Sequence, residues 1–214
     1  MTTALGADRV KRANLDSDPE LERVVAEEVC LREGAPRGPA PCAKDEFPAR
    51  RMVLEDTCQG MPTRHVLSRV QDTVERFRIA EIDGLRRRPE IFFLMRSGAS
   101  GRVAYARLYR YVRRRGQTCP EPSRLFAFPS RGTLGPIPRG AEGRAGSDVR
   151  VGDYSRRFRG KEPEVIETYV DRNDAFCCPS FRRTSYFRFS RRRGTYVRFA
   201  TTVRRIRSAG ATPY

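Results

Sequence analysis

Short runs of alternating apolar and polar residues dominate this chain, and very little of it repeats with the 3.6-residue period of an amphipathic helix. A period of two places successive side chains on opposite faces of a β-strand. The sequence therefore predicts an all-β fold of mainly antiparallel short strands with few helices, built as a sandwich, a barrel or a propeller-like set of blades. We expect ten strands, at residues 23–31, 51–55, 73–79, 90–96, 103–112, 124–128, 149–151, 165–170, 184–190 and 195–202.

Two long stretches rich in turn-forming residues interrupt these strands, at 33–48 and 129–148. Loops of this length are either functional or mobile. The segment 63–72, which contains His65, has no clear alternation and predicts a short helix or an irregular loop. A length of 214 residues favours one β-rich domain over residues 1–214, and two lobes of about 1–115 and 116–214 are the alternative.

The basic charge lies in the later part of the chain. Lysine and arginine total 43 against 26 acidic residues, which gives a net charge of +17. Residues 1–60 carry 9 basic and 12 acidic groups (net −3), so the remaining residues carry +20. Lysine occurs only at positions 11, 44 and 161. Arginine without lysine, together with abundant Ala, Gly and Pro, is also what codon bias in a GC-rich genome produces.

The six cysteines indicate an oxidising compartment. No CxxC pair is present and His65 is the one imidazole, so the spacing does not suit zinc. The longest apolar run, residues 91–95, is too short to cross a membrane, and residues 1–10 lack the apolar stretch of a secretory signal. We expect an extracellular or cell-envelope protein whose signal peptide is not part of this sequence. A reduced cytoplasmic protein with buried thiols is the alternative.

We expect three disulfide bridges. A bond between the neighbours Cys177 and Cys178 would strain the peptide between them, so each is expected to pair with a different partner. The possible partners are Cys30, Cys42, Cys58 and Cys119. Excluding the neighbour pair leaves 12 of the 15 arrangements, and the sequence does not choose among them. A redox-active vicinal pair is the alternative use of Cys177 and Cys178.

An acidic segment near the N-terminus, ANLDSDPELERVV at 13–25, has a weak echo in IAEIDGLRRRPEIFF at 79–93. Both place an acidic or amide run ahead of a glutamate and a β-like apolar run. This resembles the FG-GAP and VCBS-type repeats of secreted bacterial β-propeller-like proteins, and it implies a β architecture and export. We expect the first segment to form a turn leading into a strand near Arg23, and the second to repeat that geometry.

The same resemblance implies a calcium site in the first segment. In that family, alternate carboxylates of a tight loop converge on one cation. Carried over position by position, the oxygen donors are Asn14, Asp16, Asp18 and Glu22. Ser17 and Pro19 stand where the family has glycines, and Leu85 stands at a ligand position of the second copy, which cannot be an ordinary calcium site. The alternative for the first copy is an acidic turn whose side chains cap their own backbone.

A second resemblance lies near the C-terminus. The strand EVIETYV at 164–170, the CCPS turn at 177–180 and the aromatic strand YFRF at 186–189 look like the C-terminal region of actinobacterial envelope lipoproteins of the LppP/LprE type. Those proteins complete the hairpin with a tryptophan-containing strand, and this chain has no tryptophan. The resemblance implies a location in the cell envelope and no mechanism.

The clearest single element is a C-terminal hairpin, TSYFRFS-RRRG-TYVRFAT. Alternation predicts one buried face with Ser185, Phe187 and Phe189 on the first strand and Thr195, Val197 and Phe199 on the second. The other face and the turn are expected to form a contact surface for an anionic partner, with solvated arginines as the alternative. The residues of that surface are Tyr186, Arg188, Arg191, Arg192, Arg193, Tyr196 and Arg198.

No catalytic constellation is found, because the chain has one histidine, no GxSxG and no phosphate-binding loop. We therefore expect a non-enzymatic, secreted or envelope-associated, disulfide-bonded β module with a binding or structural role. Its partner would be an anionic envelope polymer or a lipid surface. The alternative is a nucleic-acid-binding protein that uses its arginines and aromatic residues, and an envelope-polymer hydrolase is a third hypothesis.

Overall fold

The computed structural model is an all-β protein. It describes residues 9–16, 18–32, 35–39, 42–68, 73–82, 89–97, 103–130, 132–151, 162–172 and 179–206. No helix occurs among these residues, and so none that could span a membrane. The strands are β1 (Arg9–Ala13), β2 (Glu22–Arg32), β3 (Ala35–Pro39), β4 (Phe47–Cys58), β5 (Met61–Val66), β6 (Thr73–Ala80), β7 (Glu90–Ser97), β8 (Val103–Val112), β9 (Glu121–Phe128), β10 (Gly143–Arg150), β11 (Glu164–Val170), β12 (Phe181–Ser190) and β13 (Thr195–Arg205).

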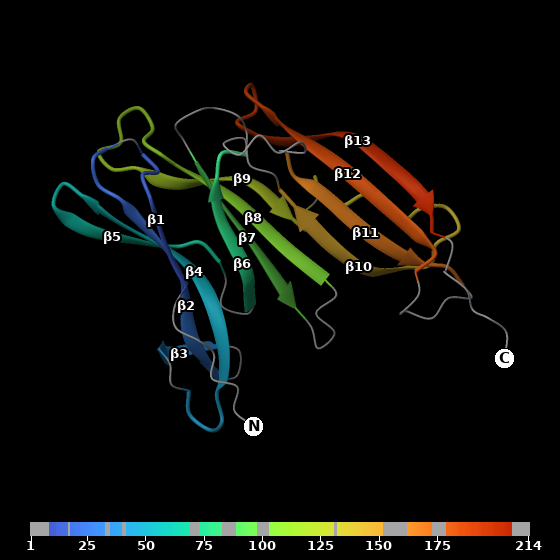
Figure 1. The fold of residues 1–214 in the computed structure, drawn as a ribbon, viewed down its shortest axis with the longest axis horizontal. Coiled ribbons are helices and arrows are strands. Elements are labelled where there is room, and N and C mark those ends of the chain that lie inside the picture. The colour runs from blue at the N-terminus through green and yellow to red at the C-terminus, as the bar shows by residue number, and fades with distance from the viewer. Residues whose placement is uncertain are drawn as a thin grey trace.

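The strands form three successive antiparallel sheets (Figure 1). The first sheet has the order β1-β2-β4-β5, with β3 paired to β2. The second sheet is β6-β7-β8-β9, and the third is β10-β11-β12-β13. The second and third sheets are meanders in which each strand pairs with the next along the chain, whereas in the first sheet β3 and β4 both pair with β2. The expected all-β fold of mainly antiparallel strands is confirmed. A closed barrel is not formed by the described strands.

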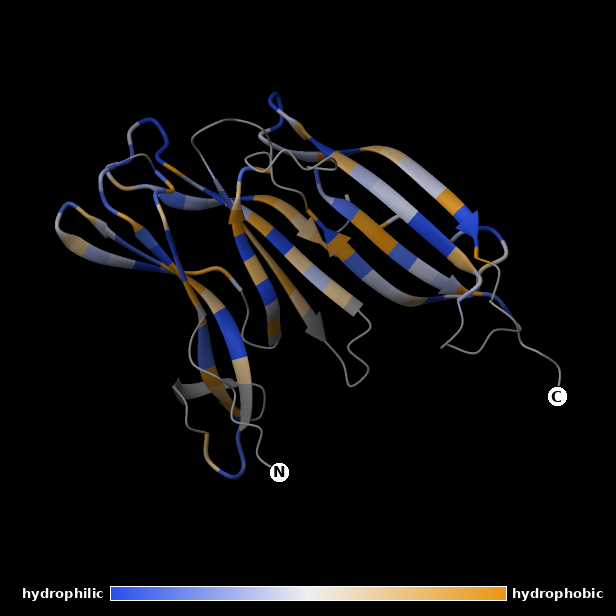
Figure 2. Ribbon diagram, in the orientation of Figure 1, coloured by the Kyte–Doolittle hydropathy of each residue, from blue (hydrophilic) through white to orange (hydrophobic). Residues whose placement is uncertain are grey.

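The second sheet lies between the other two and is buried on both faces. On β7, Ile91, Phe93 and Met95 face a core shared with the first sheet, whereas Phe92 and Leu94 face a core shared with the third. This explains why 91–95 is the longest apolar run of the sequence, because a strand covered on both faces does not alternate. The first and second sheets meet through β4 and β6, and the second and third sheets meet through β8 and β10. In each case the third strand in the order of one sheet packs against the first strand of the next. Figure 2 shows the hydrophobic residues gathered along this middle sheet.

All ten expected strands are present, and the sequence analysis missed three. The three are β1, β3 and β5, and each lies at an edge of the first sheet. The described side chains of β1 and β5 bury little apolar surface. The expected helix or loop at 63–72 is wrong in its first part, because β5 includes His65. The expected loop at 33–48 contains β3, whose two prolines are tolerated on an edge strand. The loop at 129–148 ends earlier than expected, where β10 begins at Gly143. The alternative lobe boundary near residue 115 falls in the turn between β8 and β9, which pair in one sheet.

Two disulfide bonds join parts of the chain that the sheets bring together. Cys30 of β2 is bonded to Cys42, 12 residues away, and Cys58 at the end of β4 is bonded to Cys119, 61 residues away. The second bond ties the first sheet to the turn between β8 and β9. The expectation that two of these four cysteines pair with Cys177 and Cys178 is wrong, because all four are bonded to one another. Cys177 and Cys178 themselves lie outside the described residues.

Candidate functional site

The acidic segment forms the loop between β1 and β2, and β2 begins at Glu22, as expected. Its side chains bond to the loop backbone. Asn14 donates its side-chain amide to the carbonyl of Asp18. Asp16 Oδ1 accepts from the Asp18 backbone N–H at 3.1 Å, and Asp18 Oδ1 accepts from the N–H of Glu20 at 2.8 Å. The loop is therefore an acidic turn capped by its own side chains.

Three of the four expected calcium ligands also converge. Oxygen atoms of Asp16, Asp18 and Glu22 lie within 4.8 Å of one another. The Glu22 side chain is fully buried; Oε2 accepts a hydrogen bond from the Leu15 N–H, and Oε1 has no hydrogen-bond partner among the described residues. Burial and the nearby carboxylates of Asp16 and Asp56 raise the pKa of Glu22 to about 7. A divalent cation would offset this repulsion and satisfy the remaining oxygen.

The described part of the second copy, residues 79–82 and 89–93, repeats one contact of the first. Glu90 opens β7 as Glu22 opens β2, and its Oε2 accepts from the N–H of Ile82 at 2.8 Å. The other oxygen of Glu90 is paired with the guanidinium of Arg110. The guanidinium of a side chain therefore lies beside this glutamate.

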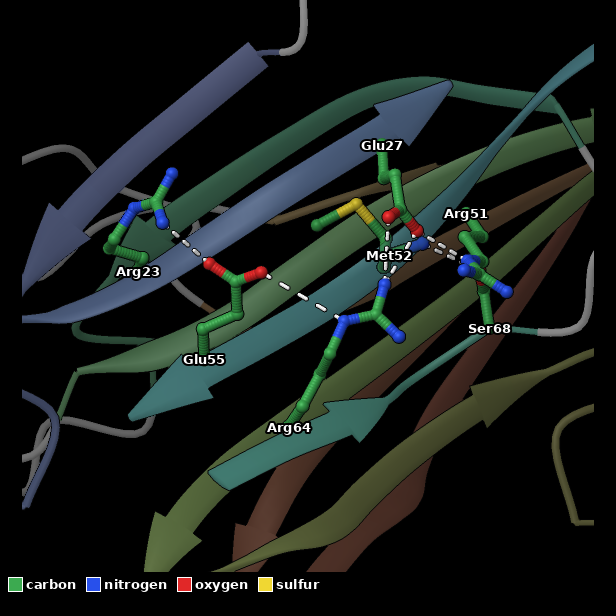
Figure 3. A network of polar contacts seen from close by, with 7 residues as sticks. All are labelled: Arg23, Glu27, Arg51, Met52, Glu55, Arg64 and Ser68. Atoms are coloured by element: carbon green, nitrogen blue, oxygen red, sulfur yellow. Dashed lines mark hydrogen bonds and ion pairs between the residues drawn. The ribbon is translucent and has the colours of Figure 1, made fainter. Parts of the chain in front are cut away.

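The outward face of the first sheet, turned away from the second sheet, carries a network that the sequence analysis missed (Figure 3). Arg23 on β2 bonds to Glu55 on β4 at 2.8 Å, and Arg64 on β5 approaches Glu55 at 3.9 Å and Glu27 at 2.8 Å. Arg51 pairs with Glu27 as well. We call these five residues, Arg23, Glu27, Arg51, Glu55 and Arg64, the ion-pair ladder. Oppositely charged residues at alternate positions of β2 and β4, which share one face of each strand, were the sequence signal that could have predicted it.

A cavity of about 480 Å³ adjoins one end of the ladder, between the acidic loop and the β4–β5 hairpin. Asp56, one of its lining residues, is buried and accepts a hydrogen bond from the Tyr111 hydroxyl at 2.7 Å. Burial, together with this bond, raises the pKa of Tyr111. Three carboxylates and two guanidinium groups line the cavity, so it has no dominant charge. The lining residues are Glu20, Leu21, Arg23, Glu55, Asp56, Thr57, Pro62, Thr63 and Arg64.

The second candidate site is the arginine hairpin, residues 181–205, formed by β12, β13 and their turn. It contains nine arginines and no acidic residue. Arg183 is buried against Glu167, and the other eight are exposed. The exposed arginines are Arg182, Arg188, Arg191, Arg192, Arg193, Arg198, Arg204 and Arg205.

The structure corrects the expected faces of this hairpin. Phe187 is buried and Arg188 is exposed, as expected, but Tyr196 is buried and Phe199 is 51% exposed. The four-residue turn 191–194 places Phe189 opposite Tyr196, and opposite residues share a face. Phe199, three residues after Tyr196, then falls on the opposite, outward face. Tyr196 is therefore removed from the expected contact surface.

Aromatic rings support the outward-facing arginines instead of lying open. The guanidinium of Arg188 lies 5.6 Å from the centre of the Phe199 ring, and Tyr186 packs against the same ring at 6.4 Å. Arg205 lies over Phe181 in the same way, at 5.8 Å. Such cation–π contacts hold guanidinium groups in place at a protein surface.

Comparisons with protein-family models, with curated proteins and with solved structures find no match for this chain. The geometry of the sites is therefore the whole basis for a function.

Proposed function

We propose that this protein is an exported module that binds an anionic envelope polymer carrying phosphate groups through its arginine hairpin. The protein is a disulfide-bonded β module. The observation that carries the proposal is the absence of any acidic residue in a hairpin with eight exposed arginines. Guanidinium groups match phosphate oxygens with paired hydrogen bonds, and a surface rich in exposed arginines attracts a polyanion over a long range.

Export is supported by the disulfides. Bonds such as Cys30–Cys42 and Cys58–Cys119 form and persist in oxidising compartments and are rare in reducing ones. Envelope polymers are the polyanions that such a protein meets. The resemblances of the acidic segment and of the CCPS region favour the same location.

The aromatic contacts favour a phosphate polymer over single-stranded nucleic acid. Base recognition uses exposed ring faces on which bases stack. In the arginine hairpin, Arg188 and Tyr186 contact Phe199, Arg205 covers Phe181, and Tyr196 is buried. These rings are already used to hold arginines and to fill the core.

The test replaces the turn. The variant Arg191→Ser/Arg192→Ser/Arg193→Ser is compared with Arg12→Ser/Arg32→Ser/Lys44→Ser, which removes the same charge from exposed residues in and beside the first sheet. The probe is synthetic poly(glycerol phosphate), with binding measured by calorimetry at several salt concentrations. We expect the turn variant to lose about tenfold or more in affinity and to show a shallower salt dependence, and the control to bind nearly as the wild type does.

Two further probes distinguish the phosphate polymer from the alternative partners, nucleic acid and a lipid surface. Single-stranded DNA of matched charge tests nucleic acid, and phosphatidylglycerol vesicles test a lipid surface. Tighter binding of DNA at equal charge would support the nucleic-acid alternative against our proposal, and preference for vesicles would support a lipid surface. Equal losses in the turn variant and in the control would show that only net charge matters.

We also propose a calcium ion at Asp16, Asp18 and Glu22 with a structural role. The buried Glu22 oxygen without a partner supports it. Because the raised pKa keeps Glu22 partly protonated near neutral pH, calcium should raise the melting temperature at pH 8 and have little effect at pH 5. Asp16→Asn/Asp18→Asn should abolish the shift and Glu20→Gln should keep it. Equal melting temperatures with and without calcium at pH 8 would leave only the acidic turn.

A further inference from the structure

The sequence RRRG occurs twice, at 113–116 and at 191–194. Each copy connects the third strand of a sheet to the fourth, β8 to β9 in the second sheet and β12 to β13 in the third. Each ends on a glycine with a positive φ, 85° at Gly116 and 61° at Gly194. All six arginines of the two turns are exposed. We call these segments the two arginine turns.

The two arginine turns lie on neighbouring strands. Thr195, which follows the second turn directly, donates its hydroxyl to the carbonyl of Leu125 on β9. The first turn begins beyond the pair of Val112 and Glu121, at the start of β9. Four residues separate Glu121 from Leu125, which corresponds to about 14 Å along an antiparallel strand. Figures 1 and 2 show both turns, strongly hydrophilic, at the same upper edge of the molecule.

The first arginine turn is held in place by its surroundings. The Cys58–Cys119 bond fixes its end to the first sheet, and Gln117 bonds back to Arg114 through both its side chain and its backbone. Burial raises the pKa of Asp16, and Arg113 lies close enough to the acidic loop to oppose part of that rise. The acidic loop therefore limits the basic surface on this side, and Arg114 and Arg115 are the residues left to contact an anion.

Resting on the proposed binding by the arginine hairpin, we propose that Arg114 and Arg115 form a second contact for the same polymer chain. A linear polymer of phosphates held at one arginine turn is then at high effective concentration at the other. Two fixed contacts anchored at different positions along β9 favour a chain long enough to reach both. The protein thus selects long polymers over short ones.

The experiment varies polymer length. Wild type, Arg114→Ser/Arg115→Ser and a charge-matched control, Arg12→Ser/Lys44→Ser, are titrated with poly(glycerol phosphate) of ~2 and of ~10 repeats. Association constants are divided by the number of phosphate groups, because a longer chain offers more equivalent positions at which a single site can bind. We expect wild type and control to bind the long polymer about tenfold more tightly per phosphate, and Arg114→Ser/Arg115→Ser to lose that advantage while it binds the short polymer unchanged.

The outcomes distinguish the two proposals. Loss of affinity for both lengths in the 191–193 variant, with no specific effect of Arg114→Ser/Arg115→Ser on the long polymer, would overturn the second contact and leave the hairpin proposal standing. An unaltered affinity in the 191–193 variant would overturn the hairpin proposal itself. Reduced binding of the short polymer by Arg114→Ser/Arg115→Ser would also contradict the two-point contact, because a short chain held at the hairpin should not reach it.

Discussion

The first and third sheets both carry exposed arginines, but these arginines have different neighbours. In the ion-pair ladder, three arginines alternate with two glutamates across β2, β4 and β5. In the arginine hairpin, no acidic residue occurs on either strand or in the turn. The same residue type therefore closes a sheet face at one end of the molecule and forms the proposed binding surface at the other.

The two sheets also differ in how they are held. The first sheet contains one disulfide bond and is tied to the second sheet by another. Among the described residues the third sheet has neither, and its attachment depends on aromatic packing. Phe187 and Tyr196 meet Phe126 of the second sheet edge-on, at 5.2 and 6.3 Å between ring centres. Cross-links stabilise one end of the fold and a hydrophobic core stabilises the other, and each can be removed separately.

Removing the aromatic attachment should have the largest effect. Phe187→Ala deletes a side chain that is 1% exposed in the core between the second and third sheets, and we expect a loss of about 3 to 5 kcal/mol in the free energy of unfolding. Urea denaturation measures it. Phe199→Ala is the control, since that ring is half-exposed, and it should cost less than about 1 kcal/mol. Equal losses would mean that the hairpin faces are assigned wrongly.

Removing the long disulfide should come next. Cys58→Ser/Cys119→Ser opens a loop of 61 residues, and we expect a loss of about 3 kcal/mol. Cys30→Ser/Cys42→Ser opens a loop of 12 residues and should cost less, because the unfolded chain gains less freedom. The two double variants are compared by thermal unfolding without reductant. A larger loss of stability in Cys30→Ser/Cys42→Ser would show that local packing around Cys30, and not the length of the loop, determines how much a disulfide bond stabilises this fold.

How far the sequence predicts the fold depends on burial. Strands such as β7 and β8, at the centre of a sheet, were predicted within one residue at either end, because apolar side chains mark them. The edge strands β1, β3 and β5 carry little apolar surface and were missed. The faces of β13 were reversed because they depend on the turn length, which alternation alone does not report.

The candidate sites were predictable where one segment contains them. Asp16, Asp18 and Glu22 belong to one loop, and the arginine hairpin is continuous in sequence. The ion-pair ladder joins three strands, and the two arginine turns are 78 residues apart, from 113 to 191. Only the sheet order brings such residues together. The prediction of the disulfide pairs was wrong for the same reason, because the spacing of cysteines in the sequence does not show which of them lie close together in the fold.

The ladder itself should be sensitive to acid. Burial raises the pKa of Glu27, but hydrogen bonds and charges from Arg51 and Arg64 outweigh it, and the pKa lies below its ordinary value of 4.5. The carboxylate therefore stabilises the fold above that value, and the stabilisation is lost as the pH falls through the folded-state pKa. Glu27→Gln should cost about 1 kcal/mol at pH 7 and nothing at the lowest pH where the fold survives. Glu121→Gln, an exposed carboxylate outside the ladder, is the control. A loss that does not depend on pH would mean that Glu27 acts through packing.

Removing a single arginine should have the smallest effect on stability, and this effect should have opposite signs in the ion-pair ladder and in the arginine hairpin. Arg64→Gln leaves Glu27 and Glu55 with one cation fewer and should destabilise the fold by a few tenths of a kcal/mol. Arg182 stands directly opposite Arg204 on the neighbouring strand, and like charges in that position repel. Arg182→Gln should therefore stabilise by a few tenths of a kcal/mol at low salt, and the gain should disappear at high salt because the repulsion is screened. Differential scanning calorimetry of both variants at two salt concentrations measures the signs. If Arg182→Gln destabilises as Arg64→Gln does, the hairpin arginines contribute to the fold, and the contrast between a paired face and a binding face is wrong.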